Sequence, residues 1–254
     1  MLHRNLQHEL MDDPHLPRDQ HELALKGLSR LNCFTGVAAL MYRHLRRRVD
    51  VNAQRPLRIL DVASGAGDVP IYWARRARRD GVEMEITLLD VSEVAVDTQQ
   101  QRAAQAGVEV QSVQADCLAH PLPGGFDVVT SSLFMHHLND EQAGTLLRAM
   151  KVATDATILV CDLHRSRMNL AMVAFAGRVL SRSPVVHTDS VLSVQGAYTQ
   201  AEFQTLAQAV LGGSIEMHPA FPCRFLASYE KPAPADPQII ANVADVPTVS
   251  SVAV

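Results

Sequence analysis

A glycine-rich turn flanked by carboxylates is the part of this sequence whose residue types and spacing point most clearly to chemistry. Segment 61–68 reads DVASGAGD, and its small residues are Ala63, Gly65 and Gly67. Such residues let the backbone turn sharply and let a ligand lie against it without interference from Cβ atoms. Asp68 stands where a pyrophosphate would need the positive end of a helix, and Asp61 adds a second negative charge. The segment therefore predicts a nucleoside ligand that carries positive charge.

Two further carboxylates suit the remaining parts of such a ligand. Asp90 follows the last glycine at close to the spacing at which an acidic side chain accepts hydrogen bonds from ribose hydroxyls. Asp116, with Cys117, is placed to meet an adenine ring and its exocyclic amine. S-adenosylmethionine has an ammonium, a sulfonium and no phosphate, so its charges fit these carboxylates.

The elements that must position these residues alternate along the chain. Nearly continuous apolar runs predict strands over 57–62, 84–89, 108–113, 126–131 and 157–161. Helices are predicted over 69–79, 92–106 and 140–150. We expect Ser92 to cap the second helix at its start, Gly107 to end it, and Asn139 or Asp140 to cap the third. This order predicts an α/β fold, a Rossmann-like doubly wound sheet that binds its ligand at the carboxyl ends of the strands.

The flanking segments do not follow this rhythm. N-terminal helices are expected within 18–48, the first of them opened by Asp19 and Glu22. Residues 166–197 read as an inserted helical cap, and a capping box at Thr199 opens another helix. Two last strands are predicted over 214–218 and 224–229, as antiparallel neighbours that complete a seven-stranded sheet.

With these residues, the chain resembles the class I S-adenosylmethionine-dependent methyltransferases. Within this class, it is similar to the small-molecule group related to quinone-biosynthesis methyltransferases. The resemblance is carried by DVASGAGD at 61–68, LLD at 88–90, AD at 115–116 and FDVVTSSLFMHHL at 126–138. It implies that Asp61 and the 63–67 loop hold the methionine part of the cofactor, Asp90 the ribose, Asp116 with Cys117 the adenine, and that Ser131 lies beside it. The implied cofactor-binding residues are Asp61, Ala63, Ser64, Gly65, Gly67, Asp90, Val91, Asp116, Cys117 and Ser131. The family usually has glycine at the position of Ala63, and we expect the ligand to tolerate this methyl group.

The resemblance also divides the chain. It implies a methyltransferase domain over 51–230 that includes the cap, with the N-terminal helices over 1–50 as a lid. From residue 231 the composition turns to Pro, Ala, Asp and Val without periodicity, so 231–254 is expected to be a disordered tail. The apolar residues of the lid and cap could close a pocket for a hydrophobic or aromatic acceptor, or could be simple core. They are Leu23, Leu28, Leu31, Phe34, Met168, Met172, Phe175 and Leu180. We expect O- or C-methylation of a phenol, quinol or polyketide-like ring.

Histidines near the ends of the fourth and fifth strands could remove a proton from such an acceptor: His136, His137 and His164. The catalytic candidates are His136 and His137, and we favour His136 because two adjacent side chains at a helix start are not expected to point inward together. A structural histidine is the alternative for each. Asp162, His164 and His136 could resemble metal ligands, but the carboxylate and amide cluster of metal-dependent catechol methyltransferases is absent, so no metal is expected.

Other residues complete the expected acceptor and cofactor contacts. Phe134 and Met135 are expected to face the acceptor, and Tyr198 to hydrogen-bond an acceptor hydroxyl or to pack as a half-buried tyrosine. Arg30 and Asn32 could reach the carboxylate of the cofactor.

Composition bounds the remaining alternatives. With 23 Lys and Arg against 27 Asp and Glu, the net charge of −4 argues against nucleic acid as a partner. Four cysteines without a CxxC pair and no apolar run of eighteen residues indicate a cytoplasmic protein with no membrane span, and a homodimer is compatible with the sequence. A nicotinamide-dependent oxidoreductase is disfavoured, because Pro70 stands where the dinucleotide fingerprint needs a small residue. A non-catalytic protein that binds S-adenosylmethionine stays open.

Overall fold

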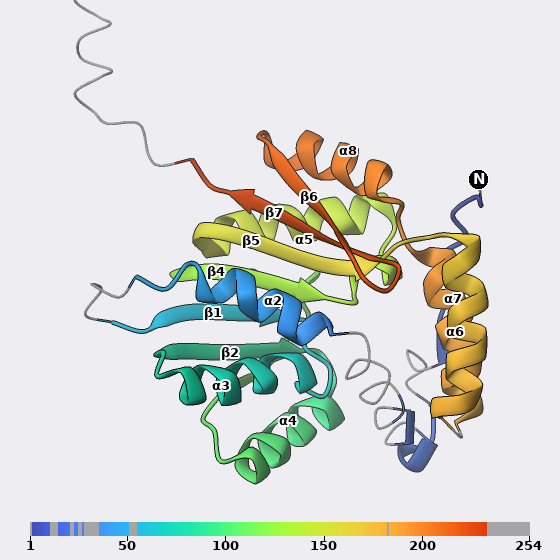
Figure 1. Ribbon diagram of the computed structural model, residues 1–254, viewed down its shortest axis with the longest axis horizontal. Coiled ribbons are helices and arrows are strands. Elements are labelled where there is room, and N and C mark those ends of the chain that lie inside the picture. Colours follow the sequence, from blue (N-terminus) through green and yellow to red (C-terminus); the bar gives the residue numbers. More distant parts are fainter. Residues whose placement is uncertain are drawn as a thin grey trace, which may run out of the picture.

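One seven-stranded sheet organises the protein, in the order β3-β2-β1-β4-β5-β7-β6 (Figure 1). The computed structural model describes residues 2–10, 15–20, 23–24, 27, 36–50, 55–181 and 183–232. The strands are β1 Leu57–Val62, β2 Met84–Asp90, β3 Gln111–Gln114, β4 Phe126–Ser132, β5 Thr154–Leu163, β6 Ile215–Ala220 and β7 Arg224–Glu230. The first five are parallel, and β7 runs antiparallel to both β5 and β6. The predicted fold class is therefore confirmed.

Helices cover both faces of the sheet and the edge at which the parallel strands end. They are α2 Val37–Arg46, α3 Asp68–Asp80, α4 Glu93–Ala106, α5 Asp140–Ala153, α6 Arg167–Leu180, α7 Pro184–Gly196 and α8 Gln200–Leu211, with the 3₁₀ turn η2 Met135–His137 after β4. Ser92 caps α4 through its hydroxyl, which accepts from Ala95 N at 3.3 Å. Asn139, rather than Asp140, caps α5, and Thr199 forms the expected capping box at α8.

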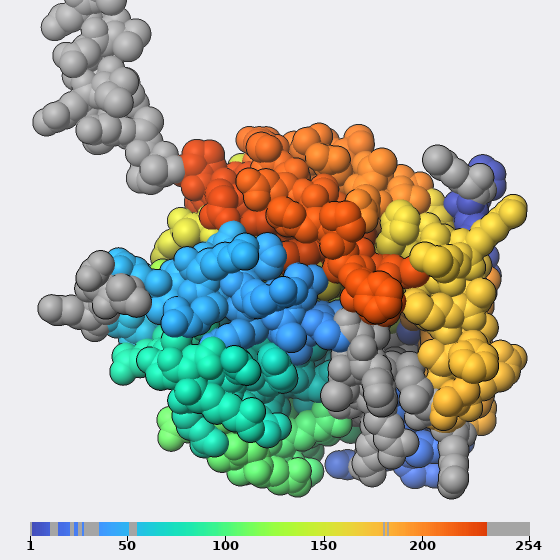
Figure 2. Space-filling model, viewed as in Figure 1, coloured from blue at the N-terminus to red at the C-terminus, as the bar shows by residue number. Residues whose placement is uncertain are grey.

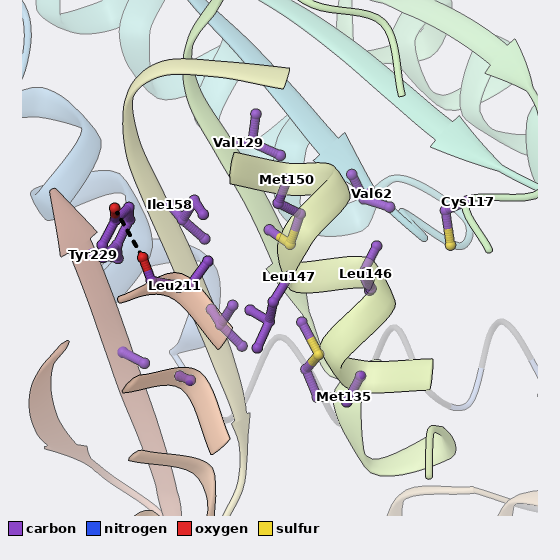
Figure 3. Packing of buried hydrophobic residues seen from close by; sticks show 14 of the residues in the cluster. Val62, Cys117, Val129, Met135, Leu146, Leu147, Met150, Ile158, Leu211 and Tyr229 are labelled. Atoms are coloured by element: carbon purple, nitrogen blue, oxygen red, sulfur yellow. Dashed lines mark hydrogen bonds between the residues drawn. The ribbon is translucent and has the colours of Figure 1, made fainter. Parts of the chain in front are cut away.

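The two faces of the sheet carry separate cores. On one face, α2 and α3 bury Met41, Leu45 and Trp73 against β1 and β2. On the other, Leu146, Leu147 and Met150 of α5 pack on β4 and β5, as Figure 3 shows. The strands are apolar on both sides because both sides are covered, which is why the apolar runs of the sequence are continuous. These cores fix the strand ends that carry the candidate site.

The cap predicted over 166–197 consists of α6 and α7, which pack against each other beyond the end of β5 (Figures 1 and 2). Helix α6 leaves Met168, Phe175 and Val179 exposed to solvent. Met168 and Phe175 therefore do not pack in the core. Several predicted features lie outside the described residues: Glu22, Leu28, Arg30, Leu31, Asn32, Phe34 and the tail from 233 onward. Among the described residues, no helix has the length and apolar character needed to cross a membrane.

Candidate active site

The loop between β1 and α3 folds as the small residues predicted. Gly65 and Gly67 have φ of 53° and 73°, in the left-handed region that glycine adopts without steric cost. A Cβ atom on Gly65 would meet no atom of the described residues within 4 Å, whereas one on Gly67 would lie 2.9 Å from Leu88 Cδ2. Gly65 therefore borders open space where a ligand can approach the backbone, and Gly67 is needed for packing. Ala63 also has positive φ, at 55°, where glycine would be easier to accommodate.

Two side chains from neighbouring elements hold this loop in place. Asp90, at the end of β2, accepts hydrogen bonds from the backbone N–H of Gly65 at 2.7 Å and of Ser92 at 2.9 Å. Gln99, fully buried on α4, donates from Nε2 to the carbonyl of Gly65 at 2.8 Å. Each carboxylate oxygen of Asp90 has a second lone pair, so a ribose hydroxyl can still donate to it. Gln99 was not predicted, since no motif separates it from the glutamines beside it.

Asp61 is a buried carboxylate that has only part of its hydrogen-bonding capacity satisfied. Its Oδ1 accepts from Thr130 Oγ1 on β4 at 2.6 Å, and its Oδ2 is buried with no partner among the described residues. Burial raises the pKa of Asp61 to about 7, against the lowering effect of hydrogen bonds from Thr130 and Ser64. A cation placed at Oδ2 would satisfy this oxygen and favour the ionised carboxylate.

Ser131 is a second polar group without a partner at the same edge. It is buried at the end of β4, paired in register with Val62 of β1, and its Oγ has no hydrogen-bond partner among the described residues. Buried polar atoms in folded proteins are almost always paired with protein, water or ligand. The orphaned oxygens of Asp61 and Ser131 therefore fit a polar ligand at the ends of β1 and β4.

The residues predicted to meet the adenine lie at the ends of β2 and β3. Val91 has an exposed side chain directly after Asp90, where an apolar surface can cover a flat ring. Asp116 accepts at Oδ1 from Leu118 N at 2.8 Å, so it also shapes the turn that follows. Cys117 lies within the apolar core beneath α5, and burial raises the pKa of its thiol to about 12. A neutral thiol in this position can serve simply as an apolar core residue, which is the alternative to a role in adenine contact.

The two histidines after β4 lie in a nearly dry site. His136 is 5% exposed, and its Nδ1 is 2.6 Å from Asp162 Oδ1 at the end of β5. Burial raises the pKa of Asp162, but the charge of His136 and its hydrogen bonds outweigh that effect, and the net pKa is lowered. Asp162 is thereby favoured in its ionised form, and its contact with Nδ1 leaves Nε2 of His136 on the opposite side of the ring, toward Glu9.

A carboxylate from the N-terminal segment joins these histidines. Glu9 is buried, and its Oε1 lies 3.9 Å from His136 Nε2 and 3.8 Å from His137 Nδ1. Both rings therefore share Glu9 as a neighbour, and His136 is the more buried of the two, with 5% of its side chain exposed against 21% for His137. Sequence reasoning missed Glu9, since nothing in the polar stretch around it marks it as part of a site.

Other predicted acceptor residues have structural surroundings. Met135 is fully buried in the core under α5. Tyr198 is buried, donates to Asp140 Oδ1 at 2.9 Å, and lies under the guanidinium of Arg4. Among the described residues, Glu9, His136 and His137 form a group that could hold a metal ion. His164 is not part of this group.

Comparison with known proteins gives a family and a fold. Residues 59–183 match the family described as a methyltransferase domain. A demethylmenaquinone methyltransferase from Thermus thermophilus is 35% identical over 112 residues, which covers 42% of this chain and 49% of that enzyme. A 3-hydroxy-5-methyl-1-naphthoate 3-O-methyltransferase from Streptomyces sahachiroi is 30% identical over 130 residues, which covers 50% of this chain and 36% of that enzyme. Each match therefore spans less than half of the relative's length.

A solved structure shows the same architecture over more of the chain. The O-methyltransferase family 2 protein from Planctomyces limnophilus superposes with a TM-score of 0.62 at 16% identity, covering 86% of this chain and 63% of that protein. At this identity the likeness concerns the fold.

Proposed function

We propose that this chain is a class I S-adenosylmethionine-dependent methyltransferase, as the match of residues 59–183 to a methyltransferase domain supports, and that it transfers the methyl group of S-adenosylmethionine to a small hydrophobic or aromatic acceptor. The observation that carries the proposal is the pair of buried, unpartnered oxygens, Asp61 Oδ2 and Ser131 Oγ, at the edge that also presents the open backbone of Gly65. A cationic nucleoside satisfies this set better than a pyrophosphate does, because every charged side chain of the loop is a carboxylate.

The residues along this edge would hold the cofactor from one end to the other. Asp61 faces the ammonium of the methionine part, Asp90 accepts from the ribose, and Val91 covers the adenine. When bound, the cofactor supplies an activated methyl group on a sulfonium. The chain's own contribution is alignment and exclusion of water, which are the main requirements of an in-line displacement.

The acceptor is best matched by a hydroxylated aromatic or quinone-type ring. The two relatives named above act, by their names, on demethylmenaquinone and on a hydroxylated naphthoate. A hydroxyl acceptor must lose its proton, and the Nε2 lone pair of His136, fixed by Asp162 at Nδ1, supports that loss. The cap helices α6 and α7 lie at the same edge and would keep the acceptor away from water.

Calorimetric titration with S-adenosylmethionine tests the cofactor half of the proposal. We expect saturable binding by the full chain and a loss of at least 10-fold in affinity for Asp90→Ala, because both the ribose contact and the support of the Gly65 N–H are removed. Asp155→Asn is the matched control, since Asp155 is exposed at the opposite end of the sheet. Absence of binding, or equal binding by Asp90→Ala, would refute the proposal.

Transfer of a labelled methyl group to a panel of phenols, quinols and amines tests the acceptor half. For a hydroxyl acceptor, His136→Asn should lower turnover by about 10²- to 10⁴-fold, the usual contribution of acid–base groups, while S-adenosylmethionine still binds. A variant that turned over phenols at the unaltered rate would exclude His136 from the proton step. Preferential methylation of amines would exclude the aromatic hydroxyl class.

A further inference from the structure

We propose that Glu9, His136 and His137 bind a divalent transition-metal ion, for which zinc is the best match. Three potential ligand atoms, Glu9 Oε1, His136 Nε2 and His137 Nδ1, lie within 4.8 Å of one another, and two of the three residues are buried. Two imidazoles and one carboxylate with a further open position form the donor set of many catalytic zinc sites.

The distances are close to those that an ion requires. Ligand atoms at 2.0 to 2.1 Å from a tetrahedral zinc ion are about 3.4 Å apart. Here the carboxylate oxygen is 3.9 Å from one ring nitrogen and 3.8 Å from the other. The two distances from Glu9 therefore exceed the zinc-site value by about half an ångström, and the two ring nitrogens lie within 4.8 Å of each other.

Surrounding residues already orient the ligands as they are oriented in metal sites. His136 is bound through Nδ1 to Asp162 at 2.6 Å, so its Nε2 is the nitrogen available to an ion. Metal-bound histidines almost always have such a carboxylate or carbonyl partner on their other nitrogen. Glu9 Oε1 accepts from Ser193 Oγ of α7 at 2.5 Å, which fixes the carboxylate.

Charge balance also favours an ion. Asp162 and Glu9 are both buried carboxylates beside two imidazoles. A divalent cation between Glu9 and the two imidazoles would place positive charge beside these two buried carboxylates.

This site would deepen the proposed function, on which its catalytic role rests. With Nε2 of His136 bound to the ion, the ion rather than that lone pair would assist the loss of the acceptor's proton. The hydroxyl oxygen would take a fourth position on the ion, which would lower the pKa of that hydroxyl. The O–H bond would then break, with its electron pair left on oxygen and the proton passed to water.

The sequence predicts no metal ion, because Asp162, His164 and His136 lack the carboxylate and amide cluster of metal-dependent catechol methyltransferases. That prediction does not take account of Glu9, which lies far from these residues along the chain.

Titration of the full chain with zinc chloride tests the site directly, after any affinity tag has been removed and the protein treated with a chelator. We expect one zinc ion per chain. Glu9→Gln and His137→Asn should each weaken binding at least 10-fold, and Asp162→Asn by about 10- to 100-fold, as is typical for partners of ligating histidines. His120→Asn is the matched control, because His120 is exposed and outside the cluster.

Two further measurements keep the outcome decisive. Zinc should raise the thermal midpoint of the unaltered chain and leave that of Glu9→Gln unchanged, a comparison that also shows whether the variant is folded. Cobalt, as a probe, should give the visible absorption of a tetrahedral site, and the bands should weaken in His137→Asn. No saturable zinc binding, or binding indifferent to both variants, would overturn the proposal and leave a histidine–glutamate ion pair.

Failure of the metal site is distinguishable from failure of the proposed function. The cofactor contacts of Asp61 and Asp90 do not involve the cluster, so chelator-treated protein and Glu9→Gln should bind S-adenosylmethionine like the unaltered chain. Cofactor binding without zinc binding would refute the metal site alone. Zinc binding without cofactor binding would refute the proposed function alone.

Discussion

Asp61 combines a cost in stability with a role in binding. A carboxylate that stays protonated to about pH 7 in the folded chain, against about 4 in the unfolded chain, opposes folding once it is ionised, on the order of 4 kcal/mol at most. The cost is absent below pH 4, grows as the pH rises, and levels off above pH 7. A cation bound at Asp61 would share this charge and reduce the cost.

We therefore predict that Asp61→Asn stabilises the cofactor-free protein in a pH-dependent manner. The amide keeps the shape of the side chain and removes its charge. The thermal midpoint of the variant should therefore exceed that of the unaltered chain at pH 8 and approach it at pH 5. Differential scanning calorimetry at both pH values measures this difference. A gain in midpoint that is equal at both pH values would show that the ionisation of Asp61 is not its cause.

The same carboxylate predicts how cofactor affinity depends on pH. Because a cationic ligand favours ionised Asp61, affinity should rise from pH 6 to pH 7 by no more than 10-fold and then level off. Binding by Asp61→Asn should be weak and lack this rise. Calorimetric titrations in buffers of different ionisation enthalpy would detect the released proton, and a flat profile in the unaltered chain would contradict the assignment.

The two glycines of the loop should respond differently to the same substitution. Both have positive φ, so alanine costs about 1 kcal/mol of backbone strain at either position. Gly67→Ala also forces Cβ against Leu88 and Gln99 and should unfold at clearly lower urea concentration than Gly65→Ala. Gly65→Ala should lose cofactor affinity through a methyl group in open space. Equal unfolding midpoints for the two variants would refute the distinction.

At the scale of the element, α4 contributes to the site through one amide. Gln99→Leu should weaken cofactor binding several-fold and lower stability by about 1 kcal/mol, because the Gly65 carbonyl loses its donor. Gln100→Leu is the control, as Gln100 is exposed on the same helix. Calorimetric titration and urea unfolding measure both effects, and identical behaviour of the two variants would show that the amide does not hold the loop.

The sheet and its helices were predictable because burial on both faces leaves a strong apolar signal. β1 matches its predicted bounds, and the capped helices begin within a residue of their predicted starts. β3 is shorter than predicted because only Gln111–Gln114 pair with β2 at the sheet edge. β5 begins earlier, at Thr154, whose hydroxyl rather than an apolar side chain organises the strand start.

The site was predictable only in part, for a related reason. Carboxylates at strand ends follow from the chain order, since parallel strands bring their carboxyl ends to one edge. Partners from other elements do not. Gln99 stands in a run of three glutamines, and only the fold selects one of them. Glu9 and His136 are separated by about half of the chain, and a local sequence pattern cannot indicate such a contact.

At the scale of the whole molecule, the N-terminal segment fastens the cap to the sheet. Arg4 donates to the carbonyls of Gly196 and Leu138 and stacks on Tyr198, and Asn5 N donates to Gln195 O at 3.0 Å. Leu10 N donates to Asp189 at 2.8 Å. Residues 2–10 therefore link α7 with the turn η2 that carries the paired histidines.

We predict that Arg4→Ala loosens this connection. Loss of two carbonyl contacts and the stacking on Tyr198 should cost about 1 to 3 kcal/mol, which corresponds to a thermal midpoint lower by several degrees in a chain of this size. Arg4→Lys, which keeps the charge but not the planar fork, should recover only part of it. Scanning fluorimetry measures the thermal midpoints. An unchanged midpoint for Arg4→Ala would show that the contacts of Arg4 do not stabilise the packing of the cap against the sheet.

The position of Glu9 has a practical consequence for anyone who expresses this protein. A deletion that trims residues 1–10 to aid crystallisation would remove a side chain of the histidine cluster, and a polyhistidine tag fused before them would place competing imidazoles near it. Assays on such shortened or tagged material would report on an altered centre, so protein that keeps these residues and carries no tag is the proper reagent.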